Sequence, residues 1–498
     1  MRRTYLFILF TVIGIFVLSG CTNVNEPAGA SASSSAEAAS AGKIATTTPS
    51  EEARKEFVKG RDLAERLLIQ DSIQHFDKAI SLDANFALAE LNRANVSPTA
   101  KEFFDHLKKA VSLADKASEG ERLLILGTEA GANGNTVKQK ELLEKLVAAY
   151  PNDERARFTL AGYYFGQQDF PSAILHYKKA TEVAPSYSPA YNLLGYAYRQ
   201  NEEYANSEQA FRKYIELIPN DPNPYDSLAE LYLKIGKFDD AITQYRKALS
   251  IDSNFINSHL GIGAALMYQG KTDEAAAEIN KITTKARSDG ERRGALFALT
   301  VLAADSGKLD QALAEVDKQY ALGEKSGDVP NMAGDLQLRG NILLEAGRYD
   351  EAKQAYERSL KMTLDSSLSS EIKENAKLFH HYNLASVALG KKDLATAKSE
   401  TEEFRKGAEA AKNTAQVKQA HELAGRIALE EKKYDQAIAE LLQANQQNPY
   451  DLYRLCEAYQ GKGDAQKAKE FCGKAAGFNS LPQLNYAFIR TKSQKMAA

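Results

Sequence analysis

The sequence predicts an all-α solenoid, which is a stack of helical pairs in which no single pair can fold alone. Three prolines, Pro151, Pro185 and Pro219, stand thirty-four residues apart. The segments between them share one order of bulky and small residues. Within each segment, apolar residues return every three or four positions, the period of a helix with one buried face. A period of this length is typical of repeat architectures.

The central segment shows the pattern most clearly. Tyr191, Leu194, Gly195 and Tyr198 form one stripe of a helix, and a second stripe follows a polar turn. Small residues let two antiparallel helices approach closely, while large residues fill the sides of the contact. Because neither helix can bury its stripe alone, the pairs must stack.

These segments resemble the tetratricopeptide repeat (TPR) family. The family signature has a bulky residue at position 4, Leu-Gly at 7–8, aromatics at 11 and 24, Ala at 20, a small residue at 27 and Pro at 32. The residues at position 20 are Ser72, Phe103, Gln139, Ala173, Ser207, Ala241, Ala275, Ala312, Ala352, Ala397, Ala437 and Ala468. The resemblance therefore implies a right-handed TPR α-solenoid of about twelve helical pairs with a C-terminal capping helix.

The predicted domain boundaries follow from these repeats. They are a signal peptide at 1–20, a flexible tether at 21–50, a TPR array with 34-residue spacing at its centre at 51–300, longer-spaced TPR-like repeats at 301–480, and a capping helix and tail at 481–498. Residues 21–50 are predicted to be flexible, because their small and polar side chains cannot bury enough apolar surface to offset the entropy lost on ordering. The capping helix should place Leu484, Ala487 and Phe488 on the final repeat and leave a polar outer side.

The N-terminus predicts export. Two arginines precede an apolar run over residues 5–18, and the sequence LSGC ends at Cys21. This end resembles the lipobox of bacterial lipoproteins, which implies acylation of Cys21 and anchoring to a membrane facing the periplasm or the cell surface. In that family Asp after the cysteine favours the inner membrane, so Thr22 favours the outer membrane. An uncleaved membrane anchor is the alternative, because the apolar run approaches the length of a membrane span.

Charge and composition narrow the class of partner. Loss of the signal leaves 61 basic and 66 acidic side chains, which gives no electrostatic case for nucleic acid. A protein or extended peptide partner, in an envelope assembly, secretion or signalling complex, is the predicted function. A glycan- or nutrient-binding outer-membrane lipoprotein is the alternative. It is weakened because the chain has 24 Tyr and 20 Phe but no Trp, the residue on which sugar platforms depend.

No motif predicts an enzyme, a cofactor or a metal site. Gly270-Lys271-Thr272 is not a phosphate-binding loop, because Ala265 replaces the required glycine and no strand precedes it. His421 begins a zinc-protease-like sequence that lacks the second histidine. His380 and His381 are adjacent, so their rings should point to different faces of a helix.

The resemblance also predicts the partner-binding face. In the family, positions 2, 5, 9, 12 and 13 of each first helix form a concave groove. The candidate residues are Arg155, Phe158, Phe165, Asn192, Tyr196, Arg199, Asn223, Asp226, Glu230, Asn257 and Tyr268. The asparagines are favoured, because Asn is a poor helix former whose amide can pair with an extended backbone. For Phe158 and Phe165, packing against the neighbouring repeat is the alternative.

The last repeat contains two cysteines, Cys456 and Cys472, at positions 8 and 24 of the TPR register. These are the points where the two helices of one pair face each other, so a disulfide would lock that pair. Zinc is disfavoured because no further ligand is near. Two unbridged core thiols are the alternative. Export to an oxidising compartment favours the disulfide.

Overall fold

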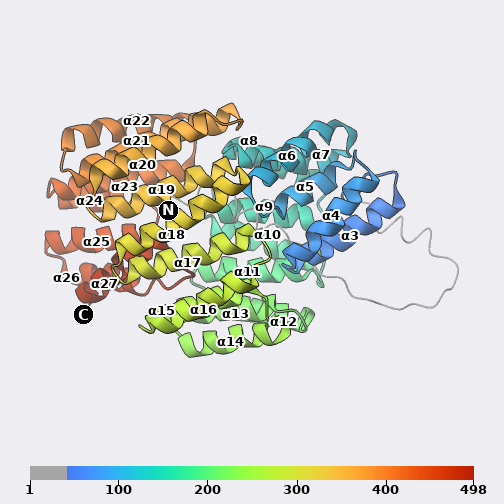
Figure 1. Cartoon of the computed structure of the whole chain (residues 1–498), viewed down its shortest axis with the longest axis horizontal. Coiled ribbons are helices and arrows are strands. Elements are labelled where there is room, and N and C mark those ends of the chain that lie inside the picture. The colour runs from blue at the N-terminus through green and yellow to red at the C-terminus, as the bar shows by residue number, and fades with distance from the viewer. Residues whose placement is uncertain (1–41, 498) are drawn as a thin grey trace. The chain divides into compact units, whose positions relative to one another are not determined.

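The computed structural model describes residues 42–497, which form helices and turns with no strand among them. The predicted signal peptide, Cys21 and the first part of the tether lie outside these residues. Twelve consecutive helical pairs are followed by one further helix, which confirms the predicted solenoid (Figure 1). No described helix has both the length and the apolar character needed to cross a membrane.

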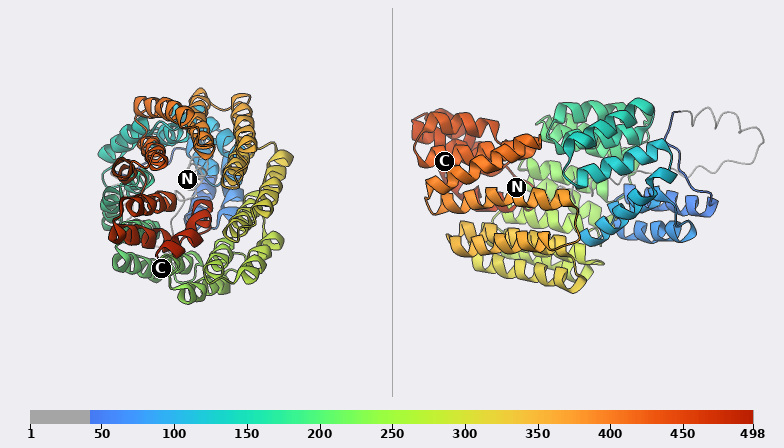
Figure 2. Two further views of the ribbon diagram at one scale, coloured as in Figure 1. Left: turned by 90° about the vertical axis from the view of Figure 1, so that its left-hand side faces the viewer. Right: turned by 90° about the horizontal axis from the view of Figure 1, so that it is seen from above.

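The helices divide into two compact units, residues 42–228 and 229–497, with the boundary inside α13 (Asn223–Lys234). Successive helices contact each other in chain order within each unit (Figure 2). The first unit contains α3 (Glu51–Glu65), α4 (Ile69–Leu82), α5 (Ala87–Asn95), α6 (Ala100–Leu113), α7 (Glu119–Ala132), α8 (Thr136–Ala149), α9 (Glu154–Gly166), α10 (Phe170–Val183), α11 (Ser188–Gln200) and α12 (Tyr204–Leu217).

The second unit continues with α14 (Phe238–Ile251), α15 (Ile256–Tyr268), α16 (Thr272–Lys285), α17 (Asp289–Asp305), α18 (Leu309–Ser326), α19 (Val329–Glu345), α20 (Tyr349–Leu364), α21 (Ser370–Gly390), α22 (Leu394–Ala410), α23 (Thr414–Glu430), α24 (Tyr434–Gln443), α25 (Pro449–Lys462), α26 (Ala465–Ala476) and α27 (Leu484–Ala497). Helices α17 to α23 contain 16–21 residues, against 12–14 in α9 to α16. The wider spacing of the later repeats is therefore due to longer helices.

Close contact within several pairs depends on a glycine of the first helix that faces a large side chain of the second, which is aromatic in some pairs and aliphatic in others. In the fifth pair, Gly195 lies against Phe211, and a Cβ atom at Gly195 would overlap that ring. In the ninth pair, Gly340 lies in the same way against Tyr356, which is fully buried. Ser207 adds a hydrogen bond by donating its hydroxyl to the Gly195 carbonyl at 2.7 Å.

A second kind of contact, between a histidine and a glutamate, recurs between the two helices of a pair. Five of the seven histidines place Nδ1 at 2.6–2.7 Å from a glutamate oxygen on the other helix of the same pair. The pairs are Glu56–His75, Glu90–His106, His259–Glu278, His381–Glu400 and His421–Glu440. The hydrogen bond from His75 holds the pKa of Glu56 below its usual range. Most histidines are thus bound within the scaffold.

The predicted tether extends too far. Residues 43–48 contact α7, α9 and the end of α4, because their backbone and side chains find partners there. The Ile44 amide donates to Asp153 at 2.9 Å, and the Thr47 amide donates to Glu121 at 2.8 Å. Lys43 forms an ion pair with Glu154 at 2.5 Å. The repeat array therefore begins with an ordered extended segment before α3.

The predicted capping helix is present as α27, and its exposed residues, Thr491, Lys492, Gln494 and Lys495, are polar as expected. Leu484, Ala487 and Phe488 are buried as expected. However, Tyr486 and Ile489 are buried as well, because α27 packs against α17 in addition to α25 and α26. The helix is therefore covered on two sides by its own unit.

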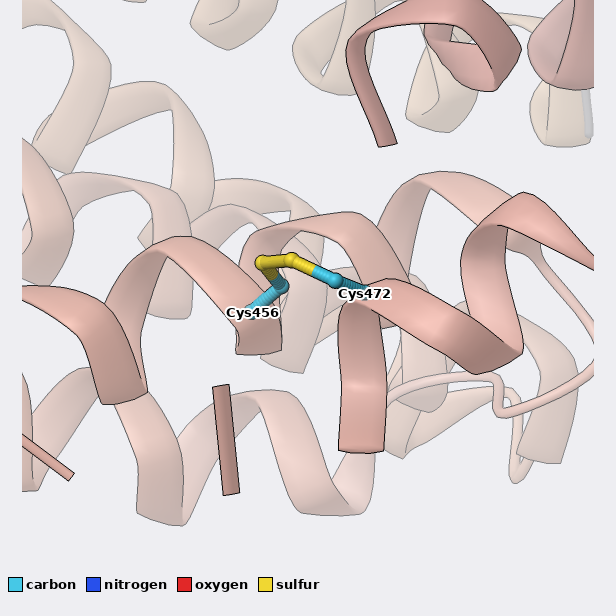
Figure 3. Close-up of a disulfide and its surroundings, with 2 residues drawn as sticks. All are labelled: Cys456 and Cys472. Carbon is cyan, nitrogen blue, oxygen red and sulfur yellow. A yellow bond between two sulfur atoms is a disulfide. The ribbon is translucent and has the colours of Figure 1, made fainter. Parts of the chain in front are cut away.

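Cys456 in α25 and Cys472 in α26 lie opposite each other with their Cα atoms 5.1 Å apart, and their sulfur atoms are joined (Figure 3). Both side chains are buried. The separation lies in the usual range of about 4.4–6.8 Å for disulfides.

Gly340→Ala should lower the melting temperature, because overpacking against Tyr356 costs about 1–3 kcal/mol. Gly294→Ala is the matched control, since Gly294 also lies inside a helix but a Cβ atom there would meet no neighbouring atom. The control should melt at the same or a higher temperature, because Ala favours a helix over Gly by up to ~1 kcal/mol. Thermal melts followed by circular dichroism measure both. Equal melting temperatures would contradict the close-packing account.

Alkylation of the denatured, unreduced protein, followed by mass analysis, should label neither Cys456 nor Cys472, while prior reduction should expose both. Removing the bridge with Cys456→Ser and Cys472→Ser should destabilise the end of the array by about 3 kcal/mol under the chain-entropy model. Labelling of both residues without reductant would instead establish two unbridged thiols.

Candidate functional site

The predicted partner-binding residues lie on the first helices of four successive pairs, α9, α11, α13 and α15. We call this surface the first-helix face and treat each unit separately. In residues 42–228 it comprises the predicted residues of α9 and α11 and the first part of α13. In residues 229–497 it comprises the rest of α13 and α15.

On α9, Phe158 is a core residue. It is 3% exposed and packs edge-on against Tyr177 and Tyr187, with ring centroids 5.6 and 5.7 Å apart. Its prediction as a partner-binding residue is wrong, because the neighbouring repeat already covers it. Phe165 is half-buried against Phe170 and keeps part of its surface exposed.

Arg155 binds acids within its own unit. Its guanidinium donates to Glu65 at 3.1 Å and to Glu154 at 2.7 Å, and it lies 5.3 Å from the centre of the Tyr187 ring. Burial raises the pKa of Glu65 to about 7, although Arg155 opposes this shift. Arg66 likewise binds both carboxylate oxygens of Asp221, at 2.7 and 2.5 Å. The end of α3 thus pairs with charged residues at the start of two first helices, α9 and α13.

The three asparagines do not form one accessible row. Asn223 is 1% exposed and donates its amide to the Tyr214 hydroxyl at 2.7 Å, so it stabilises the packing of α12 and α13. Asn192 is 2% exposed, and its Oδ1 accepts no hydrogen bond within residues 42–497. Asn257 is exposed. The prediction that the asparagines share a binding face is wrong for Asn223, because a side chain of its own unit already uses its amide.

Tyr196 and Arg199 form the most suitable binding surface in residues 42–228. Both are partly exposed on α11. The Arg199 guanidinium lies 4.6 Å from the centre of the Tyr196 ring, and the Tyr196 hydroxyl donates to Ser227 at 3.3 Å. Asp226 beside Ser227 is buried. A cation stacked on a fixed aromatic ring presents a flat apolar surface with hydrogen-bond donors at its edge.

In residues 229–497, the first-helix face is largely occupied by the chain itself. Glu230 is partly exposed. Tyr268 donates its hydroxyl to the Ser480 carbonyl at 2.5 Å and packs against Tyr486. Burial raises the pKa of Tyr268 above its usual range. Tyr268 was predicted to bind a partner, but in this unit it binds Ser480, a residue 212 positions away in the sequence.

A cavity of about 190 Å³ remains between α19, α21, α23, α25 and α27. Its lining mixes polar and apolar groups and carries both charges; it includes Glu345, Tyr382, Glu422, Arg426, Asn485 and Phe488. Tyr382 donates its hydroxyl to both oxygens of Glu422, at 2.8 and 2.9 Å. Arg426 lies 3.5 Å from Glu422, so this carboxylate is bound by two residues of the lining. Across residues 42–497, no three potential metal ligands gather in one place.

Comparison with protein families identifies three kinds of repeat along the chain. Models described as tetratricopeptide repeat match residues 126–188 and 158–222, one described as TPR repeat matches 230–270, and one described as tetratricopeptide repeat-like domain matches 257–376. The comparison with curated proteins finds no match.

Several solved structures are similar. MamA is 26% identical over 34% of this chain and 91% of its own, with a TM-score of 0.28. A tetratricopeptide repeat protein from Parabacteroides merdae is 16% identical over 52% of this chain and 98% of its own, with a TM-score of 0.36. YrrB, a TPR protein with an unusual peptide-binding site, is 20% identical over 37% of this chain and 93% of its own, with a TM-score of 0.25.

The family matches and the helical pairs agree on the repeat. Residues 126–222 and 230–270 therefore match tetratricopeptide repeats, residues 257–376 match a tetratricopeptide repeat-like domain, and the described residues fold as an all-helical TPR-like solenoid.

Proposed function

We propose that this TPR scaffold binds a protein or an extended peptide of a partner through the first-helix face of residues 42–228. The observation that carries the proposal is the stacked pair Tyr196 and Arg199 on α11, which is partly exposed and held by a hydrogen bond from Tyr196 to Ser227. Tyr and Arg are the side chains that most often dominate binding energy at protein interfaces. Partly exposed Phe165 on α9 extends the apolar part of this surface.

We further propose that the scaffold is exported and anchored by an acylated Cys21, with the outer membrane favoured, and that it serves an envelope assembly, secretion or signalling complex. The support is the N-terminal sequence, with its arginines, its apolar run and the LSGC lipobox. The paired cysteines of the last repeat also fit an oxidising compartment, since disulfides persist mainly outside the cytosol.

Replacing Tyr196 and Arg199 together by Ala should reduce partner capture from native membranes at least tenfold. Hot-spot residues each contribute more than about 1 kcal/mol, and about 1.4 kcal/mol is one factor of ten in affinity. The measurement is quantitative mass spectrometry of the proteins that copurify with the full chain.

The matched control removes an apolar side chain and a cation from a second helix, with Leu175→Ala and Lys178→Ala on α10. Both residues are exposed. Capture by the control should equal that of the wild type. Unchanged capture by the Tyr196 and Arg199 variant, or an equal loss in the control, would move the binding surface elsewhere.

Cys21→Ala should block acylation and leave unprocessed precursor in the inner membrane, because the thiol is the acceptor of the lipid in the proposed anchor. Membrane fractionation and mass analysis of the N-terminus measure this. Recovery of normally processed, lipid-bearing protein from the variant would show that Cys21 is not the anchor.

A further inference from the structure

The C-terminal segment, residues 478–497, lies across four successive repeats of its own unit. It contacts Lys234, Tyr268, Asp305 and Glu345, the last residues of α13, α15, α17 and α19. Each of these residues occupies position 13 of its repeat, counted from Ala at position 20. We call these four residues the tail groove. The repeat therefore sets the spacing of these four residues, and one segment contacts all four in chain order.

The first part of the segment is bound through its backbone. Lys234 donates its ammonium to the Phe478 carbonyl at 2.8 Å and lies 4.2 Å from the centre of the Phe478 ring. Tyr268 donates to the Ser480 carbonyl. Because carbonyl groups occur in every peptide, these two bonds select an extended chain without selecting its sequence.

The second part of the segment, α27, is bound through its side chains. Arg490 donates to both oxygens of Asp305, at 2.7 and 2.5 Å, and both side chains are nearly buried. Tyr486, one turn earlier, packs edge-on against Tyr268 with ring centroids 5.6 Å apart. Lys492 adds a half-exposed ion pair with Glu345 at 2.6 Å. Specificity therefore lies in an aromatic residue followed four positions later by Arg.

Several features make this segment a detachable occupant. Helix α27 is the one described α-helix that has no partner helix in the pairing. The bridge between Cys456 and Cys472 closes the preceding pair, so α25 and α26 need not unfold when α27 leaves. The buried Ser493 hydroxyl has no hydrogen-bond partner within residues 42–497, which is a cost of the occupied state.

We propose that the tail groove is a second recognition site, which takes a helix of a partner protein bearing an aromatic residue and an Arg one turn apart, and that the C-terminal segment is its resident occupant. The site is independent of Tyr196 and Arg199, so this proposal goes beyond the proposed function. Its covalent link to α26 keeps the segment at an effective concentration of order millimolar, against which a partner helix must compete.

The test is binding of a fluorescent synthetic peptide, residues 478–498, to the full chain by anisotropy. The chain with Arg490→Ala should bind this peptide at least tenfold more tightly than the wild type, because its own segment loses the bonds to Asp305 while the groove is intact. Lys492→Ala should shift the affinity in the same direction by less, since its ion pair is half-exposed. The peptide with Arg490→Ala should bind at least tenfold more weakly than the unaltered peptide.

Lys495→Ala is the matched control, because Lys495 is an exposed cation of the same helix. The control should bind the peptide as the wild type does. Hydrogen exchange of the Arg490→Ala chain should rise in residues 478–497 and not in α17 or α19. The proposal is overturned if neither release variant binds more tightly than the control, or if the altered peptide binds equally well. A dimer of the Arg490→Ala chain in light scattering would also overturn it, because the occupant would then be a second copy of this chain.

Discussion

The fold depends on one kind of contact, the approach of a small residue on the first helix of a pair to a large side chain on the second. Gly195 against Phe211 and Gly340 against Tyr356 bring the two backbones close enough for both helices to present one continuous apolar face. That face can be buried only by the next pair, so the contact inside a pair also requires stacking between pairs. In the last repeat the cysteines occupy these same two positions, and a covalent bond takes the place of the packing contact.

The repeat itself could be predicted because its causes are local. Residues fewer than fifty positions apart determine the stripe that contains Gly195, the turns between helices and the greater length of the later repeats. The histidine–glutamate pairs are equally local in the sequence, yet they were not predicted from it. Four of them, including His259–Glu278 and His381–Glu400, have a spacing of nineteen residues, and that recurrence was the available signal.

The predicted partner-binding face could be located only in part. The repeat register fixes the side of a helix on which a residue lies, but it does not show which other residues cover that side. Tyr268 lies on the predicted face, but Ser480 and Tyr486 cover it from the far end of the unit. Phe158 is covered by Tyr187, and Asn223 donates its amide to the Tyr214 hydroxyl. These partners are set by how successive pairs lie on one another, which no short pattern encodes.

The C-terminal segment follows from the same requirement that builds the stack. Within residues 42–497 no further pair follows α25 and α26, and α27 covers this last pair with Leu484 and Phe488. This helix also carries apolar residues on its other side, Tyr486 and Ile489, which are buried. Leaving both in water would cost about 1.5–3 kcal/mol each.

A helix with two apolar sides needs a second surface besides the last pair. The tail groove supplies that surface, because Asp305 fixes Arg490 and Tyr268 receives Tyr486. The covered last pair and the occupied groove are therefore two results of one helix with two apolar sides.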